Sequence, residues 1–450
     1  MIKNLKDFLI GENCSLSKAM KLIQKNERNT IFVTNRKKNK VIGSLTDGDI
    51  RRSLIKKNNL LEKVSIICNR NFKFVLDSSN REAALKMFDQ KYKLIPVLSK
   101  TGKLIEIIDQ MEIYPIKKII IRARAPARIS LAGGGTDITS YFLKKGGDGI
   151  SLTINMFCNV HMVPREDKKI IINSSDFNTR VEFQGLESII YNGSLDLIKA
   201  SIKLTQPNFG FEIFVESDVK PGSGLGGSAA LSCAVIGVIN YLQKRKLGKY
   251  EIAELAYQAE RIELKIPGGW QDQYSTVFGG CNIMEFSKNR NLVQNLILPN
   301  NVIDELERRF ILCDTGLLHK GPALQLRNSK NSKLYIYGNE IKRIVGELRK
   351  ELLKGETNNI GNLIHKTWKI KKKLDSKMTN RKIKHMETRL CTPKLADGCR
   401  LLGTGGGGFM LFYVKPQNRF TFIKELKKLK IKNTHIKFDL YGLRVWETNI

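Results

Sequence analysis

Residues 221–240 read PGSGLGGSAALSCAVIGVIN, a glycine-rich segment that runs into an apolar stretch. Glycines allow backbone N–H groups to approach a phosphate closely, and the N-terminus of a helix adds partial positive charge. Ser228 stands where we expect that helix to begin, so its hydroxyl can cap the helix or reach a metal ion. No Lys follows the glycines, so the segment is not a Walker A loop. Taken alone, the pattern fits a phosphate-binding loop and a tight turn into a core helix equally well.

The composition is that of a globular protein. The chain has 450 residues, 42% of them hydrophobic, which is enough for two or three domains with substantial cores. We find no secretory signal and no apolar stretch of membrane-spanning length, and we therefore expect a cytoplasmic protein without a membrane partner. Eight scattered cysteines without a CxxC pair favour reduced thiols over disulfides or a zinc site, and five isolated histidines suggest no metal cluster.

The net charge of +34 allows three interpretations. A basic protein can bind nucleic acid, or it can attract anionic substrates such as ATP and sugar phosphates. The positive charge can also arise because the proteome uses Lys as its ordinary surface residue. The basic residues are spread along the whole chain, as on solvated helix faces, so we favour the last interpretation and expect no nucleic-acid partner.

Residues 1–115 contain one α/β pattern twice. Each half has a helix followed by two strands, and a further helix begins at Asp47 or Gly48. The expected helices and strands are 16–25, 30–34, 41–45, 79–90, 94–98 and 104–108. Neither half can bury its sheet alone, so we expect the halves to pair with pseudo-symmetry.

The segment GSLTDGDIRR in the first half resembles the nucleotide-contacting segment of CBS domains, and residues 1–115 as a whole resemble a CBS pair. In that family a Thr and an Asp three residues later hold an adenine nucleotide, and Thr46 and Asp49 match this spacing. Asp109 and Glu112 occupy the corresponding places in the second half, where an acid repels phosphate. The resemblance therefore implies at most one nucleotide site. A purely structural pair, or one that forms a homo-oligomer, is an equal alternative.

Three segments in the rest of the chain have residues suited to a polar ligand. APARISLAGGGTD (125–137) ends in glycines and an acid, and IPGGWQDQY (266–274) places Asp272 among Gln, Trp and Gly. LLGTGGGGF (401–409) joins a short apolar piece to a strand. Between them, the helical pattern of 250–265 puts Glu260 and Glu263 on one face.

The glycine-rich segments 125–137, 221–230 and 401–409 resemble, in this order, the three motifs of the GHMP superfamily of small-molecule kinases, and the similarity covers about residues 122–450. The resemblance implies an α+β fold, the two-domain GHMP kinase fold, with a ribosomal S5-like N-terminal half and a ferredoxin-like C-terminal half. An α/β CBS pair precedes it. The expected domains are a CBS pair (1–115), a linker (116–121), an ATP-binding domain (122–295) and a C-terminal domain (296–450).

The resemblance also implies roles for particular residues. Asp272 matches the acid that activates the acceptor hydroxyl, and Arg128 matches the Arg that flanks it. Ser228 and Glu260 match Mg²⁺ ligands, with Glu263 as a lesser candidate. The residues expected at the ATP phosphates are Pro221, Gly222, Ser223, Gly224, Leu225, Gly226, Gly227 and Ser228, although most relatives carry Ser in place of Gly227. Those expected at the sugar are Gly135, Thr136, Asp137, Gly406 and Gly407.

RAPARISLAGGGTD and GGWQDQY are most similar to the branch that contains D-glycero-D-manno-heptose 7-phosphate kinase and L-fucokinase. The chain is too short for a bifunctional fucokinase. The resemblance therefore implies that ATP and Mg²⁺ are used to phosphorylate the anomeric hydroxyl of the heptose 7-phosphate. The 1,7-bisphosphate would serve the synthesis of nucleotide-activated heptose and surface polysaccharide. His319 and Lys320 stand where relatives usually have Arg, which leaves the sugar open. The alternatives are a kinase of an unphosphorylated sugar such as fucose, and a CBS-regulated nucleotide sensor with an inactive kinase unit.

Overall fold

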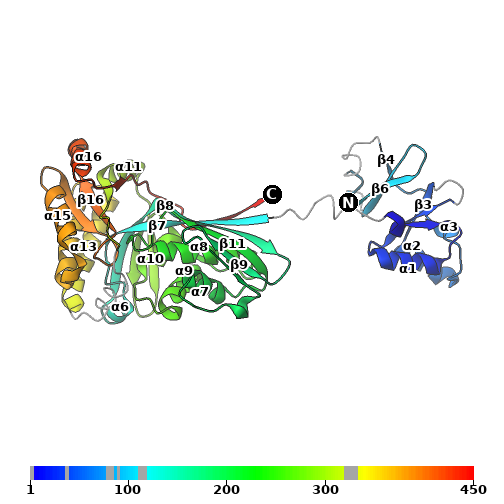
Figure 1. The fold of residues 1–450 in the computed structure, drawn as a ribbon, viewed down its shortest axis with the longest axis horizontal. Coiled ribbons are helices and arrows are strands. Elements are labelled where there is room, and N and C mark those ends of the chain that lie inside the picture. Colours follow the sequence, from blue (N-terminus) through cyan, green and yellow to red (C-terminus); the bar gives the residue numbers. More distant parts are fainter. Residues whose placement is uncertain are drawn as a thin grey trace. The chain divides into compact units, whose positions relative to one another are not determined.

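The computed structural model describes residues 5–35, 40–77, 86–88, 92–109, 119–318 and 333–449. The chain divides into two compact units, Met1–Lys117 and Lys118–Ile450 (Figure 1). Most of the helix expected at 79–90, the first residues of the expected linker, Glu112, His319 and Lys320 lie outside the described residues. In the part of the chain that is described, no helix is both long and apolar enough to cross a lipid bilayer.

The N-terminal unit has two three-stranded sheets of the same design, β1-β2-β3 and β4-β5-β6. In each, the first two strands are parallel and the last two antiparallel. Both antiparallel pairs have an irregularity at the matching place, between Val33 and Thr34 and between Val97 and Leu98. The elements are β1 (Leu9–Gly11), α1 (Leu16–Asn26), β2 (Thr30–Thr34), β3 (Val41–Thr46), α2 (Asp47–Lys57), α3 (Val64–Ile67), β4 (Val75–Leu76), β5 (Leu94–Leu98) and β6 (Leu104–Asp109), preceded by a 3-10 turn, η1 (Leu5–Phe8).

The two halves of this unit share one hydrophobic core. Phe32 and Val41 of the first half pack with Leu94 and Ile107 of the second. Asp109, 2% exposed, also accepts a bond of 2.6 Å from Arg28 Nε. The acid that departs from the expected Thr therefore helps to join the two halves of the repeat.

An eight-stranded sheet forms the centre of the second unit, in the order β10-β9-β11-β8-β12-β13, with β7 paired to both β8 and β18. β7 and β8 are long because each passes through two hydrophobic cores; Ala125 lies in one and Ile129 in the other. The strands are β7 (Ile119–Ala132), β8 (Gly147–Arg165), β9 (Ile170–Ser174), β10 (Thr179–Phe183), β11 (Gly210–Ser217), β12 (Cys281–Phe286), β13 (Asn291–Leu296) and β18 (Arg444–Asn449).

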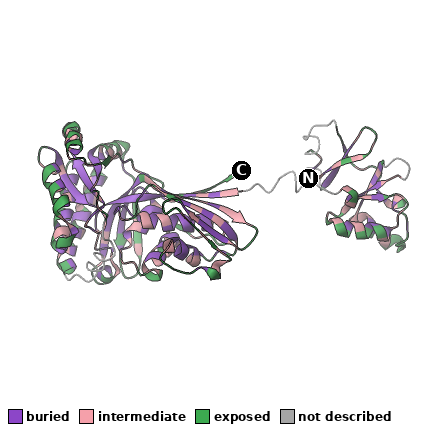
Figure 2. Cartoon of the chain, in the orientation of Figure 1, coloured by how far each residue is buried: buried purple, intermediate pink, exposed green. Residues whose placement is uncertain are grey.

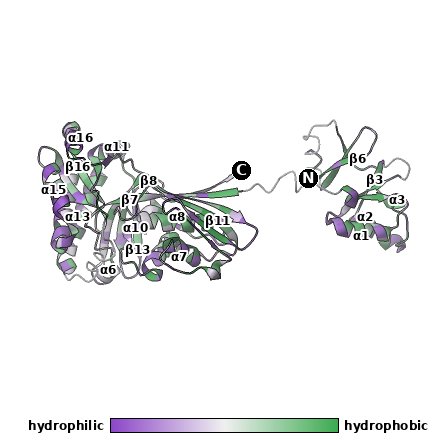
Figure 3. Ribbon diagram, in the orientation of Figure 1, coloured by the Kyte–Doolittle hydropathy of each residue, from purple (hydrophilic) through white to green (hydrophobic). Residues whose placement is uncertain are grey.

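A smaller antiparallel sheet, β15-β16-β14-β17, follows in the chain and is covered by helices that carry hydrophilic residues on their outer faces (Figure 3). α14 packs directly on β15. The strands are β14 (Phe310–Asp314), β15 (Ala396–Leu401), β16 (Phe409–Val414) and β17 (Asn433–Thr434). The helices of this part are α11 (Asn300–Arg309), α13 (Lys333–Lys354), α14 (Ile360–Leu374), α15 (Arg381–Leu390) and α16 (Arg419–Lys428), with short 3-10 turns η4 (Ser376–Met378) and η5 (Pro416–Asn418).

The helix that follows the opening glycines, α8 (Gly227–Leu242), is the most buried helix of the large-sheet half (Figure 2). Its residues from Cys233 to Ile239 are all buried, because it lies between the sheet and neighbouring helices. The other helices here are α6 (Thr139–Lys145), α7 (Asp196–Thr205), α9 (Lys249–Gln258) and α10 (Gln271–Phe278), with the turns η2 (Leu186–Ser188) and η3 (Ala259–Glu263).

Two boundaries differ from those expected. β7 begins at Ile119, so the last residues of the expected linker 116–121 are strand. Residues 296–450 do not all stay with the smaller sheet, because β18 returns to pair with β7 in register from Arg444↔Arg124. The end of the chain therefore belongs to the eight-stranded sheet, where β18 pairs with one edge of β7.

Candidate active site

A cavity of about 620 Å³ lies in the unit Lys118–Ile450, within the usual size of a small-molecule site. Its wall combines residues of β7, the loop before α8, the turn after α9, the start of α10 and the C-terminal helices. Charged side chains that line it include Arg128, Asp137, Glu260, Asp272, Lys371 and Arg400. Segments far apart in the sequence thus supply one polar site.

Arg128 and Asp272 form a bidentate ion pair at this cavity. Arg128 Nε lies 2.8 Å from Oδ1 of Asp272, and Nη2 lies 2.6 Å from Oδ2. Nη1 of Arg128 also donates to the carbonyl oxygen of Gly224, at 2.7 Å. Because the guanidinium is held from both sides, it fixes the carboxylate at the start of α10 beside the glycine-rich loop.

The loop before α8 has the backbone that its glycines predict. Gly222, Gly224 and Gly226 all have positive φ, between 77° and 82°. A Cβ on Gly224 would lie 2.8 Å from the carbonyl oxygen of Leu402, so the loop also needs glycine for its approach to the 401–409 segment. In the described part of the chain, no side chain caps the N-terminus of α8, so its first N–H groups are suited to an anionic ligand. Leu225 differs from the rest, because it is fully buried under the loop.

The structure explains why glycine stands at 227. A Cβ there would lie 3.1 Å from Cγ1 of Val219, closer than ordinary van der Waals contact. Val219 is itself 4% exposed and packs in the core beneath the loop. A serine at 227 therefore requires Val219 to shift.

Asp137 is held at the cavity by backbone N–H groups. Oδ1 accepts from Gly135 N at 2.9 Å, and Oδ2 accepts from Gln271 N at 3.3 Å. A Cβ on Gly269 would overlap Oδ2, so that glycine is needed for the loop to pass. Burial raises the pKa of Asp137, and the nearby Asp272 carboxylate raises it further.

Thr136 does not lie at the cavity, contrary to the expectation that it contacts a sugar. It is fully buried, and its hydroxyl bonds the carbonyl oxygens of Gly133 and Asp148 at 2.9 and 2.8 Å. Its side chain therefore holds the glycine turn that presents Gly135 and Asp137.

Glu260 lies in a π-helical turn, Ala259–Glu263, which follows α9. It is 4% exposed, lines the cavity with Ser228, and accepts a bond of 2.9 Å from Gln273 Nε2. The wider turn breaks the ordinary helical spacing, and such turns are frequent at functional sites. Glu263 instead accepts a hydrogen bond from the Tyr191 hydroxyl at 3.3 Å and does not line the cavity. Its position therefore does not support a role as a Mg²⁺ ligand.

In the glycine-rich segment 401–409, the residues that line the cavity differ from those expected. Gly403 and Thr404 line it, whereas Gly406 and Gly407 do not. Gly406 N donates to Met378 O at 2.9 Å, and a Cβ on Gly407 would lie 2.6 Å from Leu317 O. The four glycines allow this close packing of backbones behind the loop before α8.

In the N-terminal unit, Thr46 and Asp49 contact each other. They form a capping box at the start of α2: Asp49 N donates to Thr46 Oγ1 at 3.2 Å, and Thr46 N donates to Asp49 Oδ2 at 2.9 Å. Asp49 also pairs with Arg52 at 2.5 Å. The spacing that suggests a nucleotide site therefore has a structural role as well.

Comparison with known proteins now identifies the family. Residues 194–280 match the family model "GHMP kinases N terminal domain", and residues 2–56 match the CBS domain model. A D-glycero-alpha-D-manno-heptose 7-phosphate kinase of Campylobacter jejuni is 34% identical over 340 residues, which cover 72% of this chain and 98% of that protein. The chain belongs to the GHMP kinase family. This GHMP kinase is therefore a phosphotransferase that uses ATP and carries a CBS domain at its N-terminus.

Solved structures agree with this assignment. A D-glycero-D-manno-heptose 1-phosphate kinase from Bacteroides thetaiotaomicron has a TM-score of 0.62 and 27% identity, and covers 73% of the kinase described here and 100% of its own chain. A putative sugar kinase from Campylobacter jejuni has a TM-score of 0.60 and 32% identity, over 74% and 99%. An L-fucokinase/L-fucose-1-P guanylyltransferase of Bacteroides fragilis is 26% identical, over 71% of the kinase but only 37% of the relative.

The sequence motifs missed several basic residues of the GHMP kinase cavity, among them Lys371 and Arg400. Lys371 of α14 donates from Nζ to Gly403 O at 2.7 Å, and Arg400 of β15 is 1% exposed. Burial lowers the pKa of Lys371 to about 7, and the charges of Arg400 and Arg128 add to the shift. Burial also lowers the pKa of Arg400 to about 9. Lys371 stands in the run WKIKKK, where only the burial of one helix face distinguishes it from solvated lysines.

Proposed function

We propose that this GHMP kinase transfers the γ-phosphoryl group of ATP to the anomeric hydroxyl of a heptose 7-phosphate, D-glycero-D-manno-heptose 7-phosphate, giving the 1,7-bisphosphate. The product would enter the synthesis of nucleotide-activated heptose for surface polysaccharide. The observation that carries the proposal is a cavity in which one ion pair, Arg128–Asp272, lies beside two further cations, the partly exposed Lys371 and the buried Arg400. The heptose kinase names of the relatives from Campylobacter jejuni and Bacteroides thetaiotaomicron support the choice of sugar.

The reaction requires a carboxylate at the acceptor and positive charge at the transferred group. We assign the first role to Asp272, which orients the anomeric hydroxyl and accepts its proton as the oxygen attacks phosphorus. Arg128 holds the Asp272 carboxylate in place by its two hydrogen bonds, and it lies close to the phosphate loop through Gly224. The backbone N–H groups at the start of α8 would hold the ATP phosphates, in the segment from Pro221 to Ser228.

Asp137 would bind sugar hydroxyls, because its carboxylate is fixed by two backbone N–H groups and faces the cavity. Lys371 and Arg400 would offset the negative charge of the phosphates. A substrate that already carries a phosphate adds charge to that of ATP, and a site with only Arg128 would leave more of it uncompensated. The extra cations therefore favour the phosphorylated sugar over fucose.

Ser228 and Glu260 fit a Mg²⁺ ion bound with the ATP phosphates. Both offer oxygen ligands to one cavity, and Mg²⁺ in kinases is held by one or two protein oxygens together with the phosphates. Within the described ranges of the chain, each carboxylate oxygen of Glu260 has one partner, Gln273 or Arg261, and so keeps lone pairs that can bind a cation. Mg²⁺ bound there would neutralise charge on the β- and γ-phosphates.

A panel of sugars tests the substrate. ADP release is measured with the heptose 7-phosphate, the same heptose without phosphate, fucose and galactose. We expect at least ~100-fold higher kcat/KM for the 7-phosphate, about the contribution of two charge-assisted hydrogen bonds. Equal rates with the unphosphorylated heptose, or a preference for fucose, would contradict the proposal. An inactive nucleotide sensor would release no ADP with any sugar, although Arg128, Ser228 and Asp272 all remain in place.

For the N-terminal unit, we propose that the half with Thr46 and Asp49 binds an adenine nucleotide. In the second half, Asp109 stands in the place of the threonine, so the equivalent hydroxyl is lacking. The Asp109 carboxylate instead forms an ion pair with Arg28 at 2.6 Å. Calorimetry with AMP on the full chain, with the kinase site saturated by a non-hydrolysable ATP analogue, should detect one further site. The variant Thr46→Val should lose it, and no signal in the unmodified chain would leave a purely structural unit.

A further inference from the structure

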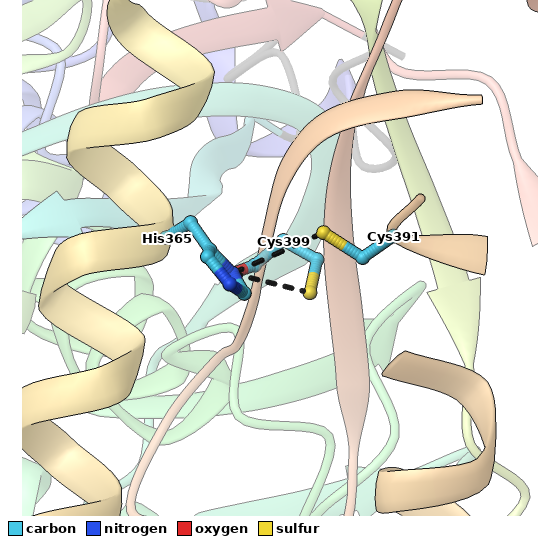
Figure 4. A group of neighbouring side chains, drawn as sticks. All are labelled: His365, Cys391 and Cys399. Carbon is cyan, nitrogen blue, oxygen red and sulfur yellow. Dashed lines mark hydrogen bonds between the residues drawn. The ribbon is translucent and has the colours of Figure 1, made fainter. Parts of the chain in front are cut away.

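Three side chains, carried by α14, by the residue after α15 and by β15, converge at one place (Figure 4). His365 lies in the second turn of α14, Cys391 follows the last residue of α15, and Cys399 lies in β15. Nδ1 of His365 is 3.9 Å from Sγ of Cys391 and 3.7 Å from Sγ of Cys399. All three potential ligand atoms lie within 4.8 Å of one another, the one such group among the described residues.

We propose that His365, Cys391 and Cys399 bind one Zn²⁺ ion. Two thiolates and an imidazole are ligands that Zn²⁺ prefers. In a tetrahedral site with Zn–S of about 2.3 Å and Zn–N of about 2.0–2.1 Å, sulfur and nitrogen lie about 3.6 Å apart. The separations of 3.7 and 3.9 Å are therefore close to those of a bound ion, and small side-chain movements complete the geometry.

The ordinary alternative is a hydrophobic core that happens to contain two thiols. Cys399 is fully buried with Trp368 and Phe412, in agreement with that view. A purely hydrophobic core does not account for the imidazole of His365, which is partly exposed and has Nδ1 facing both sulfurs. Packing this polar ring against apolar side chains costs free energy. The ring and Cys391 are each partly exposed, so water and an ion can enter from their side.

Of the residues that the structure describes, His365, Cys391 and Cys399 make up the whole group of possible ligands at this place. Glu387 of α15 accepts bonds from Trp368 Nε1 at 3.0 Å and from Lys372 Nζ at 2.6 Å. Both oxygens of Glu387 are thus engaged, and we assign the fourth position to water. Nδ1 of His365 also lies 3.2 Å from Cys399 O. Zinc binding therefore requires the tautomer with the proton on Nε2, and it releases the two thiol protons to solvent.

The site would fasten the elements that carry the basic residues of the cavity. α14 carries both His365 and Lys371, and Cys399 precedes Arg400 in β15. An ion between them ties α14 and β15 to the end of α15. The inference does not depend on the sugar or on the reaction proposed above.

Zinc content tests the site directly. The full chain is reduced with a phosphine, treated with chelator, desalted, and titrated with Zn²⁺ against a colorimetric zinc indicator. Co²⁺ is used in parallel, because tetrahedral Co²⁺–thiolate sites have characteristic visible and near-ultraviolet absorption. We expect one ion per chain. Loss of a residue that only hydrogen-bonds a metal ligand weakens metal binding by roughly 10–100-fold. Loss of a ligand itself should weaken Zn²⁺ binding by more than this, in each of the variants Cys391→Ser, His365→Gln and Cys399→Ser.

Cys14→Ser is the matched control, because Cys14 is also partly exposed but lies in the other unit. It should bind Zn²⁺ as the unmodified chain does. Tryptophan fluorescence checks folding, and the partly exposed Cys391 gives a variant that tolerates substitution if Cys399→Ser does not fold. No stoichiometric binding by the reduced chain, equal loss in the control, or a Cys391–Cys399 disulfide as the only chemistry found would overturn the proposal.

Discussion

Replacement of Lys371 by Met should make the kinase unit more stable and less active. The two side chains have similar length, so Lys371→Met removes mainly the positive charge of the cavity. The folded-state pKa of Lys371 is about 7, whereas lysine in an unfolded chain titrates near 10.4. Between these pH values the unfolded chain binds more protons, so the stability of the unmodified protein rises with pH across this window. Below about pH 7 both states carry the proton and the full cost of burying it remains.

The size of the effect follows from the pKa. One tenfold change in the ionisation equilibrium is worth about 1.4 kcal/mol, so a pKa of about 7 limits the cost at low pH to roughly 5 kcal/mol. The side chain is partly exposed, and Met also loses the hydrogen bond to Gly403 O, worth about 1–2 kcal/mol. We therefore expect Lys371→Met to raise the free energy of unfolding by roughly 2 kcal/mol at pH 6. The gain should fall below about 1 kcal/mol at pH 9.5.

Urea unfolding followed by tryptophan fluorescence measures this unit alone, because Trp270, Trp368 and Trp446 all lie in Lys118–Ile450. Lys369→Met, an exposed lysine of the same helix, is the control and should change stability little at either pH. In the same samples, ADP release should give a kcat/KM about 100-fold lower for Lys371→Met, the usual cost of removing one charge-stabilising donor. A variant that is no more stable at pH 6, or equally more stable at pH 9.5, would refute the reasoning. The groups that set the pKa, Arg400, Arg128, Asp137 and Asp272, are unchanged in this comparison.

Three other substitutions test the remainder of the site. Asp272→Asn should lower kcat by at least ~100-fold and leave ATP affinity within a few-fold, because the phosphate loop is intact; ADP release and calorimetry measure the two effects. Wild-type turnover in this variant would remove the role given to Asp272. Gly269→Ala should raise KM for the sugar ~10-fold or more without changing KM for ATP, because the new Cβ displaces the Asp137 carboxylate; a rise in KM for ATP alone would assign that region differently. Gly227→Ser should cost about 1 kcal/mol in urea unfolding through its contact with Val219, with kcat within a few-fold; lost activity at normal stability would mean that Gly227 serves the chemistry instead.

Much of the candidate site could be predicted from local sequence. Glycines with positive φ at 222, 224 and 226 are needed wherever a loop turns tightly into a helix, so their pattern is visible without a fold. Asp272 was identifiable from its unusual neighbours. The predictions were wrong where the spacing of residues in the sequence was the only guide to which residues of a segment face the cavity. Thr136, Gly406 and Gly407 lie in the right segments, but their contacts with Asp148, Met378 and Leu317 depend on chain packing that no local pattern encodes.

The sequence by itself determined the helix and strands expected at 16–25, 30–34, 41–45, 94–98 and 104–108, the glycine loop before α8 and the repeated organisation of the first 115 residues. These features depend on hydrophobic periodicity and on backbone freedom, which act over a few residues. Only the tertiary structure decided that Asp272 pairs with Arg128, that β18 joins β7, and that Lys371 differs from the other lysines of its run. It also brought His365 to Cys391 and Cys399, where isolated residues in the sequence suggested no metal site. Each of these depends on contacts between distant segments, which are specified by the packing of the whole core rather than by neighbouring residues.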